Sequence, residues 1–497
     1  MALATLYSRA QLGIEAPRVR VEVHLSGGLP SFAIVGMAET AVRESRERVR
    51  SALLNAGFEY PQRRITVNLS PADLPKEGGR YDLAIALGIL LASNQLKTTH
   101  LQQAELYSEL GLDGKLHPIR GLFPAAYACA EADSLIVIAP DNSQEASLAG
   151  AKQQLSAKTL YDLCQALSAE KLPEIDPQPP VHYPPSYPVD LSEVRGQPMA
   201  RRALEVAASG MHNLLLSGPP GSGKSMLAQA LPSILPPLSQ SSCIETASIY
   251  SVSGLPVERL FRGERPYRAP HHSASSRAMV GGGSSPRPGE ISLAHQGVLF
   301  LDELPEFPRS VLEVLREPLE TGEVSISRVA GTLTYPARFS LMAAMNPCPC
   351  GYYADGTERC QCSQALIDRY QGRVSGPLLD RFDMRLALSA VPTEELLLGE
   401  SHEECSDAVR KRVSQCQQRQ YDRQGKLNSE LTGSEVQKEL NASESLSKEF
   451  MVIATRLQLS ARACHRALRV ARTLADMNAD QAIENSHIME ALSYRQL

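Results

Sequence analysis

Hydrophobic and polar residues alternate in two short stretches near the start of the chain. In RVRVEVHL (residues 18–25) and RITVNL (64–69) every second residue is apolar, which is the pattern of half-buried β-strands. Between them, AETAVRESRERVRSALLNAG (38–57) has the spacing of an amphipathic helix and ends in a glycine. This mixture of periods predicts an α/β domain over residues 1–170.

A proline-rich stretch separates this region from the rest of the chain. Residues 171–190 contain seven prolines, which disfavour helix and central strand and favour an extended linker. Beyond it, short apolar stretches such as NLLLSG and GVLFLDE alternate with helical ones, as in a parallel sheet covered by helices. We therefore expect a second α/β domain over 191–392. Strand signals then fade, and residues 393–497 predict a helical subdomain.

The composition is that of an ordinary globular protein. The chain has 497 residues, 43% of them hydrophobic and 21% charged, with a net charge of -5. The acidic balance argues against a broad basic face for nucleic acid but leaves room for a local basic channel. No apolar run reaches the length of a membrane span, and no signal-peptide pattern opens the chain, so a cytosolic location is expected. Cysteines in that compartment are predicted to be thiols or metal ligands rather than disulfides.

One glycine-rich motif has the spacing of a phosphate-binding loop. GPPGSGKS follows the apolar strand NLLLS and precedes the helical MLAQAL. Glycines let backbone N–H groups surround phosphate oxygens, Lys224 reaches the β and γ phosphates, and Ser225 offers its hydroxyl to Mg²⁺. The predicted ATP-binding residues are Gly218, Pro219, Pro220, Gly221, Ser222, Gly223, Lys224 and Ser225.

Two later apolar strands end in residues suited to ATP hydrolysis. GVLFLDE ends in Asp302, which is expected to join Ser225 at Mg²⁺, and in Glu303, which is expected to polarise the attacking water. RFSLMAAMNP ends in Asn346, whose amide can orient that water. Capping carboxylates and a turn-forming asparagine are the plain alternatives. The order of these strands after the phosphate-binding loop favours the catalytic interpretation.

GPPGSGKS, GVLFLDELPEF, AAMNP, LLDRFD and LSAR together resemble the magnesium-chelatase-like AAA+ ATPases. RPYRAPHHSASSRAMVGGG and VNLSPADLPKEG are especially similar to the ComM/YifB group of bacterial proteins, and the resemblance covers nearly the whole chain. It implies that Arg381 is an arginine finger inserted into a neighbour's site, that Asn346 is sensor 1 and that Arg462 is sensor 2. A finger supplied in trans implies a ring, expected to be a hexamer.

The same resemblance implies a function. A protein of this group is expected to be an ATP-driven DNA motor, a branch-migration helicase that helps to integrate transforming DNA by recombination. Its expected partners are single-stranded and branched DNA and recombination proteins. Two other classes remain open: a chelatase-type motor that remodels a protein partner for metal insertion, and a protein unfoldase.

The N-terminal domain resembles the Lon-protease-like (ribosomal protein S5 domain 2-like) fold. Proteolysis in that fold needs a serine activated by a lysine. Aligning PKEGGRYDLAIALGIL and IRGLFPAA with that family places Arg80 at the serine and Phe123 at the lysine. We therefore expect this domain to be structural or to engage DNA, and to precede a P-loop AAA+ α/β domain and a C-terminal helical lid.

Four of the ten cysteines form two Cys-x-Cys pairs within an expected insertion, residues 347–363, directly after Asn346. Two close pairs of thiolates can complete a tetrahedral Zn²⁺ site, which is the preferred interpretation, although Cys-x-Cys is tighter than the usual spacing. Reduced thiols in a loop are the main alternative, and a cytosolic disulfide knot is the least favoured. The candidate zinc ligands are Cys348, Cys350, Cys360 and Cys362.

Two segments are candidates for DNA contact inside the pore of a ring. One lies before GVLFLDE, and the other is the strand–turn–strand pattern GEVSISRVAGTLTYPARF. Basic groups there would hold phosphates without reading bases. Packing of subunit against subunit is the alternative for each residue. The candidates are Arg268, His271, His272, Arg277 and Arg328.

Overall fold

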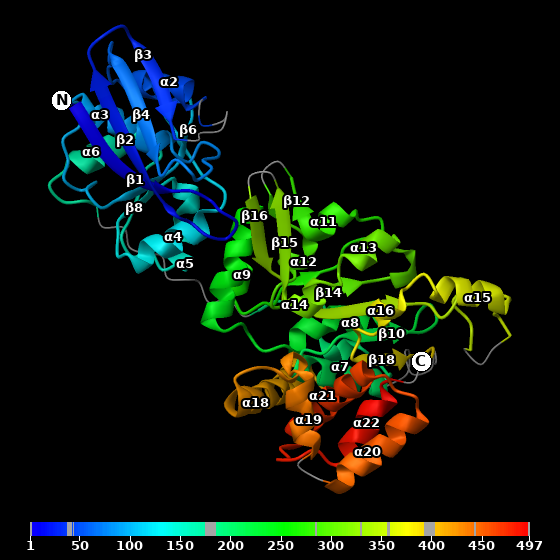
Figure 1. The fold of residues 1–497 in the computed structure, drawn as a ribbon. Coiled ribbons are helices and arrows are strands. Elements are labelled where there is room, and N and C mark those ends of the chain that lie inside the picture. The colour runs from blue at the N-terminus through cyan, green and yellow to red at the C-terminus, as the bar shows by residue number, and fades with distance from the viewer. Residues whose placement is uncertain are drawn as a thin grey trace. The chain divides into compact units, whose positions relative to one another are not determined.

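The computed structural model describes residues 2–36, 42, 44–173, 185–283, 286–328, 331–354, 358–391, 403–441 and 444–495. The chain divides into two compact units (Figure 1). Unit 1 contains Met1–Tyr183 and Cys243–Arg262, and unit 2 contains Pro184–Ser242 and Gly263–Leu497. Among the described residues no helix is long and apolar enough to cross a membrane. Most of the predicted linker, residues 174–184, lies outside the described residues.

Unit 1 is built on a seven-stranded mixed sheet with the order β3-β4-β2-β1-β5-β8-β9. Its strands are β1 (Ala2–Arg9), β2 (Arg18–Ser26), β3 (Ser31–Val35), β4 (Arg64–Ser70), β5 (Glu105–Tyr107), β8 (Ile136–Ile138) and β9 (Gln154–Ser156). A short pair, β6 (Glu109–Leu110) and β7 (Leu116–His117), lies outside this sheet. The two predicted strands are confirmed as β2 and β4, which pair antiparallel with alternate residues buried.

Helices cover this sheet. They are α2 (Ser45–Asn55), α3 (Asp82–Ala92), α4 (Leu122–Glu131), α5 (Ser143–Leu148) and α6 (Leu160–Ser168). Helix α3 is buried almost all round because it packs on β1 and β2, and it forms the centre of the core. The predicted helix 38–57 is realised as α2; residues 37–41 and 43 lie outside the described part.

Part of the chain after the phosphate-binding loop returns to unit 1. This part consists of most of α9 (Gln240–Ser253) and all of α10 (Glu258–Phe261). The Ser251 hydroxyl donates to Glu145 Oε1 at 2.5 Å, and the Phe123 N–H donates to Ser251 Oγ at 3.1 Å. The rings of Phe123 and Phe261 lie 5.7 Å apart. These contacts tie a segment from the middle of the sequence to the N-terminal fold.

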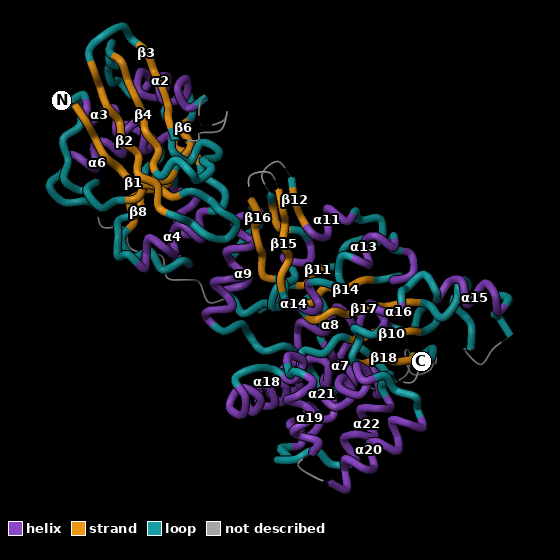
Figure 2. Tube along the Cα trace, in the orientation of Figure 1, coloured by secondary structure: helices purple, strands orange, loops and turns teal. Residues whose placement is uncertain are grey.

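Unit 2 contains a parallel five-stranded sheet with the order β11-β14-β17-β10-β18. The strands are β10 (Leu214–Ser217), β11 (Tyr267–Arg268), β14 (Val298–Leu301), β17 (Ser340–Met345) and β18 (Met384–Ala387). Figure 2 shows them among the helices α7 (Pro198–Gly210), α8 (Lys224–Ile234) and α16 (Gly376–Leu379). The central strands are buried throughout, which explains their unbroken apolar sequences.

Shorter elements decorate this sheet. The helical ones are η2 (Leu191–Glu193), α11 (Ser276–Val280), α12 (Glu290–Leu293), η3 (Leu304–Glu306), α13 (Arg309–Glu313), α14 (Pro318–Thr321) and α15 (Gln364–Gln371). Two antiparallel pairs are β12 (Gly281–Gly282) with β13 (Arg287–Pro288) and β15 (Glu323–Arg328) with β16 (Gly331–Pro336). The second pair confirms the two predicted strands, and residues 329 and 330 between them lie outside the described part.

The C-terminal region is helical, as predicted, over its described residues from 403 onward. It contains α18 (Ser406–Gln424), η4 (Asn428–Glu430), α19 (Gly433–Asn441), α20 (Glu444–Arg456), α21 (Ala461–Asn478) and α22 (Asn485–Ser493). Helices α18 and α21 pack on α7, which fixes this region to the sheet domain.

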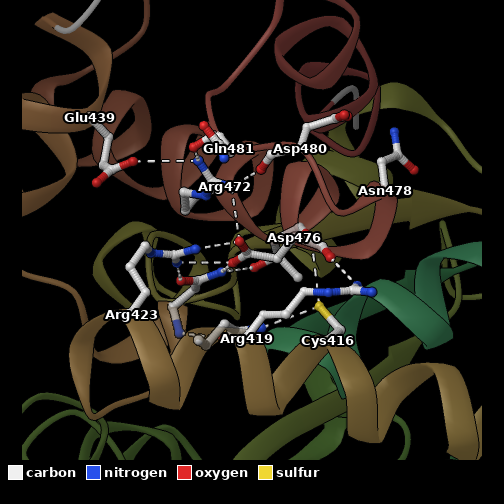
Figure 3. A network of polar contacts seen from close by, with 12 residues as sticks. Cys416, Arg419, Arg423, Glu439, Arg472, Asp476, Asn478, Asp480 and Gln481 are labelled. Atoms are coloured by element: carbon white, nitrogen blue, oxygen red, sulfur yellow. Dashed lines mark hydrogen bonds and ion pairs between the residues drawn. The ribbon is translucent and has the colours of Figure 1, made fainter.

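A buried ionic network holds the C-terminal helices to one another (Figure 3). Asp476, with 3% of its side chain exposed, accepts hydrogen bonds from Arg472 at 2.9 Å, from Arg423 and from Asn428 at 2.8 Å. Arg472 is equally buried and also donates to the carbonyl oxygen of Asp480 at 2.7 Å. Because these charges are paired away from water, losing Asp476 would leave the buried Arg472 with the more distant carboxylate of Glu439, at 3.4 Å.

Candidate functional site

The carboxyl ends of three parallel strands bring the predicted nucleotide-site residues together. Ser217 at the end of β10 pairs with Met345 at the end of β17, so the phosphate-binding loop lies beside Asn346. Strand β14 ends two positions earlier in the register, because Leu301 pairs with Ala343, and Asp302 and Glu303 follow it. This edge is where parallel α/β sheets bind ligands. It collects the residues of all three motifs.

The phosphate-binding loop runs directly into helix α8. Gly221 and Gly223 have φ angles of +79° and +85°, a backbone conformation that favours glycine and lets the loop turn back over the helix N-terminus. Nζ of Lys224 donates to the carbonyl oxygens of Gly218 at 2.7 Å and Pro219 at 2.9 Å, and to Asn346 Oδ1 at 3.2 Å. Burial lowers the pKa of Lys224, against the opposing charge of Asp302. The amine is thus held within the loop.

Ser225 and Asp302 form the oxygen-rich part of the site. The Ser225 hydroxyl donates to Asp302 Oδ2 at 2.7 Å. Hydroxyl and carboxylate oxygens are the ligands that Mg²⁺ prefers, so this pair fits the ion. Both residues line a cavity of about 350 Å³ together with Glu303 and His272.

Glu303 has an unusual backbone conformation. Its φ and ψ are 52° and 48°, the left-handed region, which costs a non-glycine residue about 1–3 kcal/mol. Its side chain is 53% exposed, and Oε2 lies 3.1 Å from Nδ1 of His272. The fold therefore maintains a strained turn that presents this carboxylate to the cavity.

Arg381 lies at the opposite, amino-terminal end of the parallel strands of the same sheet. It precedes β18, and its carbonyl oxygen accepts from Asn213 Nδ2 at 3.0 Å, just before β10 begins. The four residues of β10 separate Asn213 from Gly218, a span of about 16 Å at about 3.3 Å per residue. The Arg381 guanidinium is 6% exposed and is bound by Glu320 and by the carbonyl oxygen of Pro377 at 2.6 Å. The structure does not bring it to its own phosphate-binding loop.

Arg462 accompanies Arg381 rather than the phosphate-binding loop. It stands in the first turn of α21 and is exposed. Both arginines line a second cavity, of about 130 Å³. Its remaining lining residues are Glu320, Asp380, His465, Arg466 and Arg469. Burial and the neighbouring arginines lower the pKa of Arg381 despite Glu320. The excess of cationic groups suits this cavity to an anion.

The four cysteines of the insertion converge to one point. Their sulfur atoms all lie within 4.8 Å of one another. Sγ of Cys348 lies 3.3 Å from that of Cys350 and 3.8 Å from that of Cys360, and Cys350 and Cys360 are 3.7 Å apart. A ZnS₄ tetrahedron with Zn–S bonds of about 2.3 Å has edges of about 3.8 Å. The backbone N–H of Tyr352 lowers the pKa of Cys350 to about 7. Spacing and donor chemistry fit Zn²⁺.

The cysteine cluster packs against the phosphate-binding loop. Gly351, between the first two ligands and the rest, has φ of +88°, and a Cβ atom there would lie 2.6 Å from Cδ of Pro220. Only glycine allows this approach. The geometry of the thiol cluster and that of the nucleotide loop are therefore linked.

Comparison with known proteins identifies the family. Family models described as "Magnesium chelatase, subunit ChlI", "Subunit ChlI of Mg-chelatase" and "Magnesium chelatase, subunit ChlI C-terminal" match residues 190–396, 21–143 and 403–495. Over 499 residues the chain is 48% identical to "Competence protein ComM" of Haemophilus influenzae, covering 100% of this chain and 98% of that protein. The chain belongs to the ComM/YifB group of magnesium-chelatase-like AAA+ proteins.

Two further relatives differ in how much of the chain they match. "Uncharacterized protein YifB" of Escherichia coli is 47% identical over 498 residues, covering 100% of this chain and 97% of that protein. The "Magnesium-chelatase 38 kDa subunit" of Cereibacter sphaeroides is 27% identical over 177 residues, 32% of this chain and 53% of that protein. Membership of an AAA+ family implies ATP and Mg²⁺ as ligands, and the residues at the carboxyl edge fit both.

The DNA-contact candidates differ in their surroundings. Arg268 forms a two-point ion pair with Glu290, at 2.6 and 2.8 Å, so its charge is already used within the subunit. His271 and Arg277 are exposed. His271 and His272 both line the nucleotide-side cavity. Arg328 ends strand β15, and its side chain lies outside the described part of the structure.

At the two peptidase positions of unit 1, neither residue can supply a serine–lysine dyad. Arg80 is 6% exposed and donates to the carbonyl oxygen of Arg120 at 2.9 Å and to Gln11 Oε1 at 2.8 Å. Phe123 is completely buried. Both side chains contribute to the interior, consistent with the departures noted in the sequence.

Sequence reasoning missed two carboxylate contacts of this family member. Glu320 binds the proposed finger Arg381, and the His272–Glu303 contact links a DNA-contact candidate to the proposed base. Glu320 stands in a helical stretch without a motif, so no pattern could have singled it out. The adjacent histidines of PHHS were noticed, but their spacing gives no sign of a carboxylate about thirty residues later.

Proposed function

We propose that this protein is an ATP-dependent hexameric DNA motor of the branch-migration type, which promotes integration of transforming DNA during homologous recombination. The observation that carries the proposal is that the candidate nucleotide-site residues lie at the two opposite ends of the parallel strands of one sheet. The chain that contains them is related over its full length to a protein named for competence. DNA, single-stranded or branched, is the proposed substrate.

The residues at the carboxyl edge would carry out binding and hydrolysis. Backbone N–H groups of the phosphate-binding loop and Lys224 would neutralise the phosphates, while Ser225 and Asp302 would hold Mg²⁺. Glu303 would accept a proton from the attacking water, which Asn346 orients. When bound, Mg²⁺ stabilises negative charge on the phosphates.

Arg381 and Arg462, at the opposite end of the sheet from the phosphate-binding loop, would act on a neighbouring subunit. Arg381 and Arg462 line the same cationic cavity. The span of about 16 Å across β10 separates this end of the sheet from the phosphate-binding loop of the same subunit. Nε of Arg469 beside them is buried without a hydrogen-bond partner among the described residues. A γ phosphate held by the next subunit would supply the missing anion, with Arg381 as arginine finger and Arg462 as sensor 2. Completing every site in this way requires a closed ring, which we propose is a hexamer.

We also propose that the four-cysteine cluster holds one structural Zn²⁺ per chain. The insertion has little apolar core of its own, and a metal would order it against Pro220 of the loop. Metal analysis of reduced, chelator-washed protein tests this assignment: about one zinc per chain is expected. A zinc-free protein prepared with zinc available would favour four reduced thiols.

The N-terminal unit and the exposed candidates complete the proposal. The predicted domain limits and the Lon-protease-like fold of unit 1 are retained as proposals, with a structural or DNA-engaging role. His271, Arg277 and Arg328 are proposed to contact phosphates in the pore, where loss of bound counterions makes affinity fall with salt.

The rival function is remodelling of a protein partner, favoured by the partial similarity to a magnesium-chelatase subunit. Steady-state ATP hydrolysis measured with single-stranded DNA, with branched DNA and with candidate protein partners separates the two. Stimulation by DNA supports the motor. Stimulation only by a protein partner would replace it with a chelatase-type or unfoldase function.

A further inference from the structure

The main chain of Arg381, the proposed arginine finger, is held by a residue of helix α21. Its carbonyl oxygen accepts a hydrogen bond from Nη1 of Arg466 at 2.6 Å, in addition to the one from Asn213 at 3.0 Å. A hydrogen bond from a charged donor is stronger than one between neutral groups. The finger is therefore fastened at its backbone to the C-terminal helical region as well as to the sheet domain.

Arg466 is itself fixed by a buried carboxylate. The same Nη1 donates to Oδ1 of Asp383 at 3.1 Å, and the side chain of Asp383 is only 4% exposed. Oδ2 of Asp383 accepts from the backbone N–H of Asn213 at 3.0 Å, so both carboxylate oxygens are engaged. The guanidinium of Arg466 is thus held between two acceptors that stand two residues apart in the chain.

Arg466 stands one helical turn after Arg462, the proposed sensor 2. Residues four apart in a helix lie on the same face, and both side chains line the cavity that contains Arg381. Asp383 is buried and does not line this cavity. Arg466 therefore links the backbone of one proposed in-trans arginine to the helix that carries the other.

We propose that Arg466 is a positioning residue that fastens the arginine finger to α21, so that Arg381 and Arg462 are presented to the neighbouring subunit together. This role rests on the proposed function, since it requires Arg381 to act in trans. Without the hydrogen bond to its backbone, the finger would reach the neighbour's γ phosphate in many orientations, and few of them would match the transition state. The loss should therefore appear in the rate of hydrolysis and not in the binding of ATP.

Substitutions in the full-length protein test this role. Arg466→Ala removes the hydrogen bond, so kcat for ATP hydrolysis should fall roughly ten- to hundredfold, the factor that one hydrogen bond to a charged group contributes, while the affinity for ATP stays unchanged. Arg466→Lys keeps a cationic donor and should regain part of the rate. Asp383→Asn weakens the anchor of Arg466 without changing a residue of the cavity wall, and it should lower kcat as well. Arg456→Ala, at an exposed arginine of α20, is the control for an arginine outside the site.

Mixed assemblies show on which subunit Arg466 acts. Arg466→Ala subunits keep an intact phosphate-binding loop and Lys224→Ala subunits keep an intact finger, so an equal mixture should complete roughly one quarter of the interfaces and exceed either parent in ATPase activity. A mixture of Arg466→Ala with Arg381→Ala should gain nothing, because every finger in it is defective. Asp383→Asn should behave as Arg466→Ala in both mixtures, and it decides the question if Arg466→Ala does not assemble.

The reference mixture, Arg381→Ala with Lys224→Ala, separates this role from the proposed function. If Lys224→Ala restores Arg381→Ala but restores neither Arg466→Ala nor Asp383→Asn, although mixed assemblies form, the positioning role of Arg466 is wrong and the in-trans finger stands. An unchanged kcat in both variants overturns the role as well. If Lys224→Ala restores none of the three, action in trans is excluded, and the proposed ring mechanism fails together with the role of Arg466.

Discussion

Replacing Gly351 by alanine should weaken nucleotide binding although the residue touches no predicted ligand. The added Cβ would lie 2.6 Å from Cδ and 2.9 Å from Cγ of Pro220, distances at which atoms must move. Its φ of +88° adds a backbone cost of about 1–2 kcal/mol for a residue with a side chain. Because the cysteine cluster holds Gly351 in place, the phosphate-binding loop that carries Pro220 should move instead. Its backbone N–H groups then lose their alignment toward the phosphates.

The expected size of the effect follows from that strain. If about 1–2 kcal/mol of the overpacking against Pro220, which comes in addition to the backbone cost, is relieved by displacing the loop, ATP affinity should fall roughly five- to thirtyfold. Titration with a fluorescent ATP analogue measures the affinity, and zinc content measured on the same samples shows whether the cysteine cluster survived. Gly425→Ala is a matched control, because Gly425 has φ of +69° at the end of α18 but nothing within 4 Å of an added Cβ.

The comparison of the two glycine variants is decisive. Both carry the cost of a left-handed alanine, so a loss of affinity in Gly351→Ala alone assigns the effect to the contact with Pro220. Wild-type affinity in Gly351→Ala with a full complement of zinc would refute the link between the cysteine cluster and the phosphate-binding loop. Equal losses in both variants would assign the effect to general instability.

Three further predictions concern the two edges of the sheet and the C-terminal helices. Lys224→Ala should abolish ATP binding or hydrolysis, whereas Glu303→Gln should bind ATP and scarcely hydrolyse it, as equilibrium binding and single-turnover assays would show; normal turnover in the second variant would remove its role as base. Mixing Arg381→Ala with Lys224→Ala subunits should restore part of the ATPase activity, because some interfaces pair an intact loop with an intact finger; mixed rings no more active than either parent would exclude action in trans. Asp476→Ala should destabilise the C-terminal helices by about 3–5 kcal/mol, since Arg472 and Arg423 lose the buried carboxylate that they share and Arg472 keeps Glu439, at 3.4 Å, as its charged partner; thermal unfolding followed by circular dichroism would show no shift if the network carries no stability.

Elements with a clear period could be predicted from the sequence. Strands β2 and β4 followed from alternation, and the strand before the phosphate-binding loop followed from an unbroken apolar run directly before a glycine-rich turn. The parallel register then places the ends of β10, β14 and β17 at one edge. Local pattern and a common edge were therefore enough to assemble the candidate ATP site.

Contacts between distant residues could not be predicted in this way. The association of Ser251 with Glu145 joins a segment after the ATP loop to unit 1, although both residues look like ordinary helix residues in the sequence. The ion pair between Arg268 and Glu290 likewise involves a basic residue that the sequence indicated as a candidate for DNA contact. Such pairs depend on how elements pack, and no period in the sequence records them.

The proposal that the protein moves on DNA is tested most directly by strand exchange at a branched junction. The purified full-length protein is mixed with a labelled three- or four-stranded junction whose strands separate only if the branch point moves, with and without ATP. The account predicts ATP-dependent resolution that Glu303→Gln abolishes without abolishing DNA binding, and that is insensitive to the sequence of the arms because phosphates rather than bases are held. Protein that hydrolyses ATP and binds these junctions but resolves none of them would contradict it.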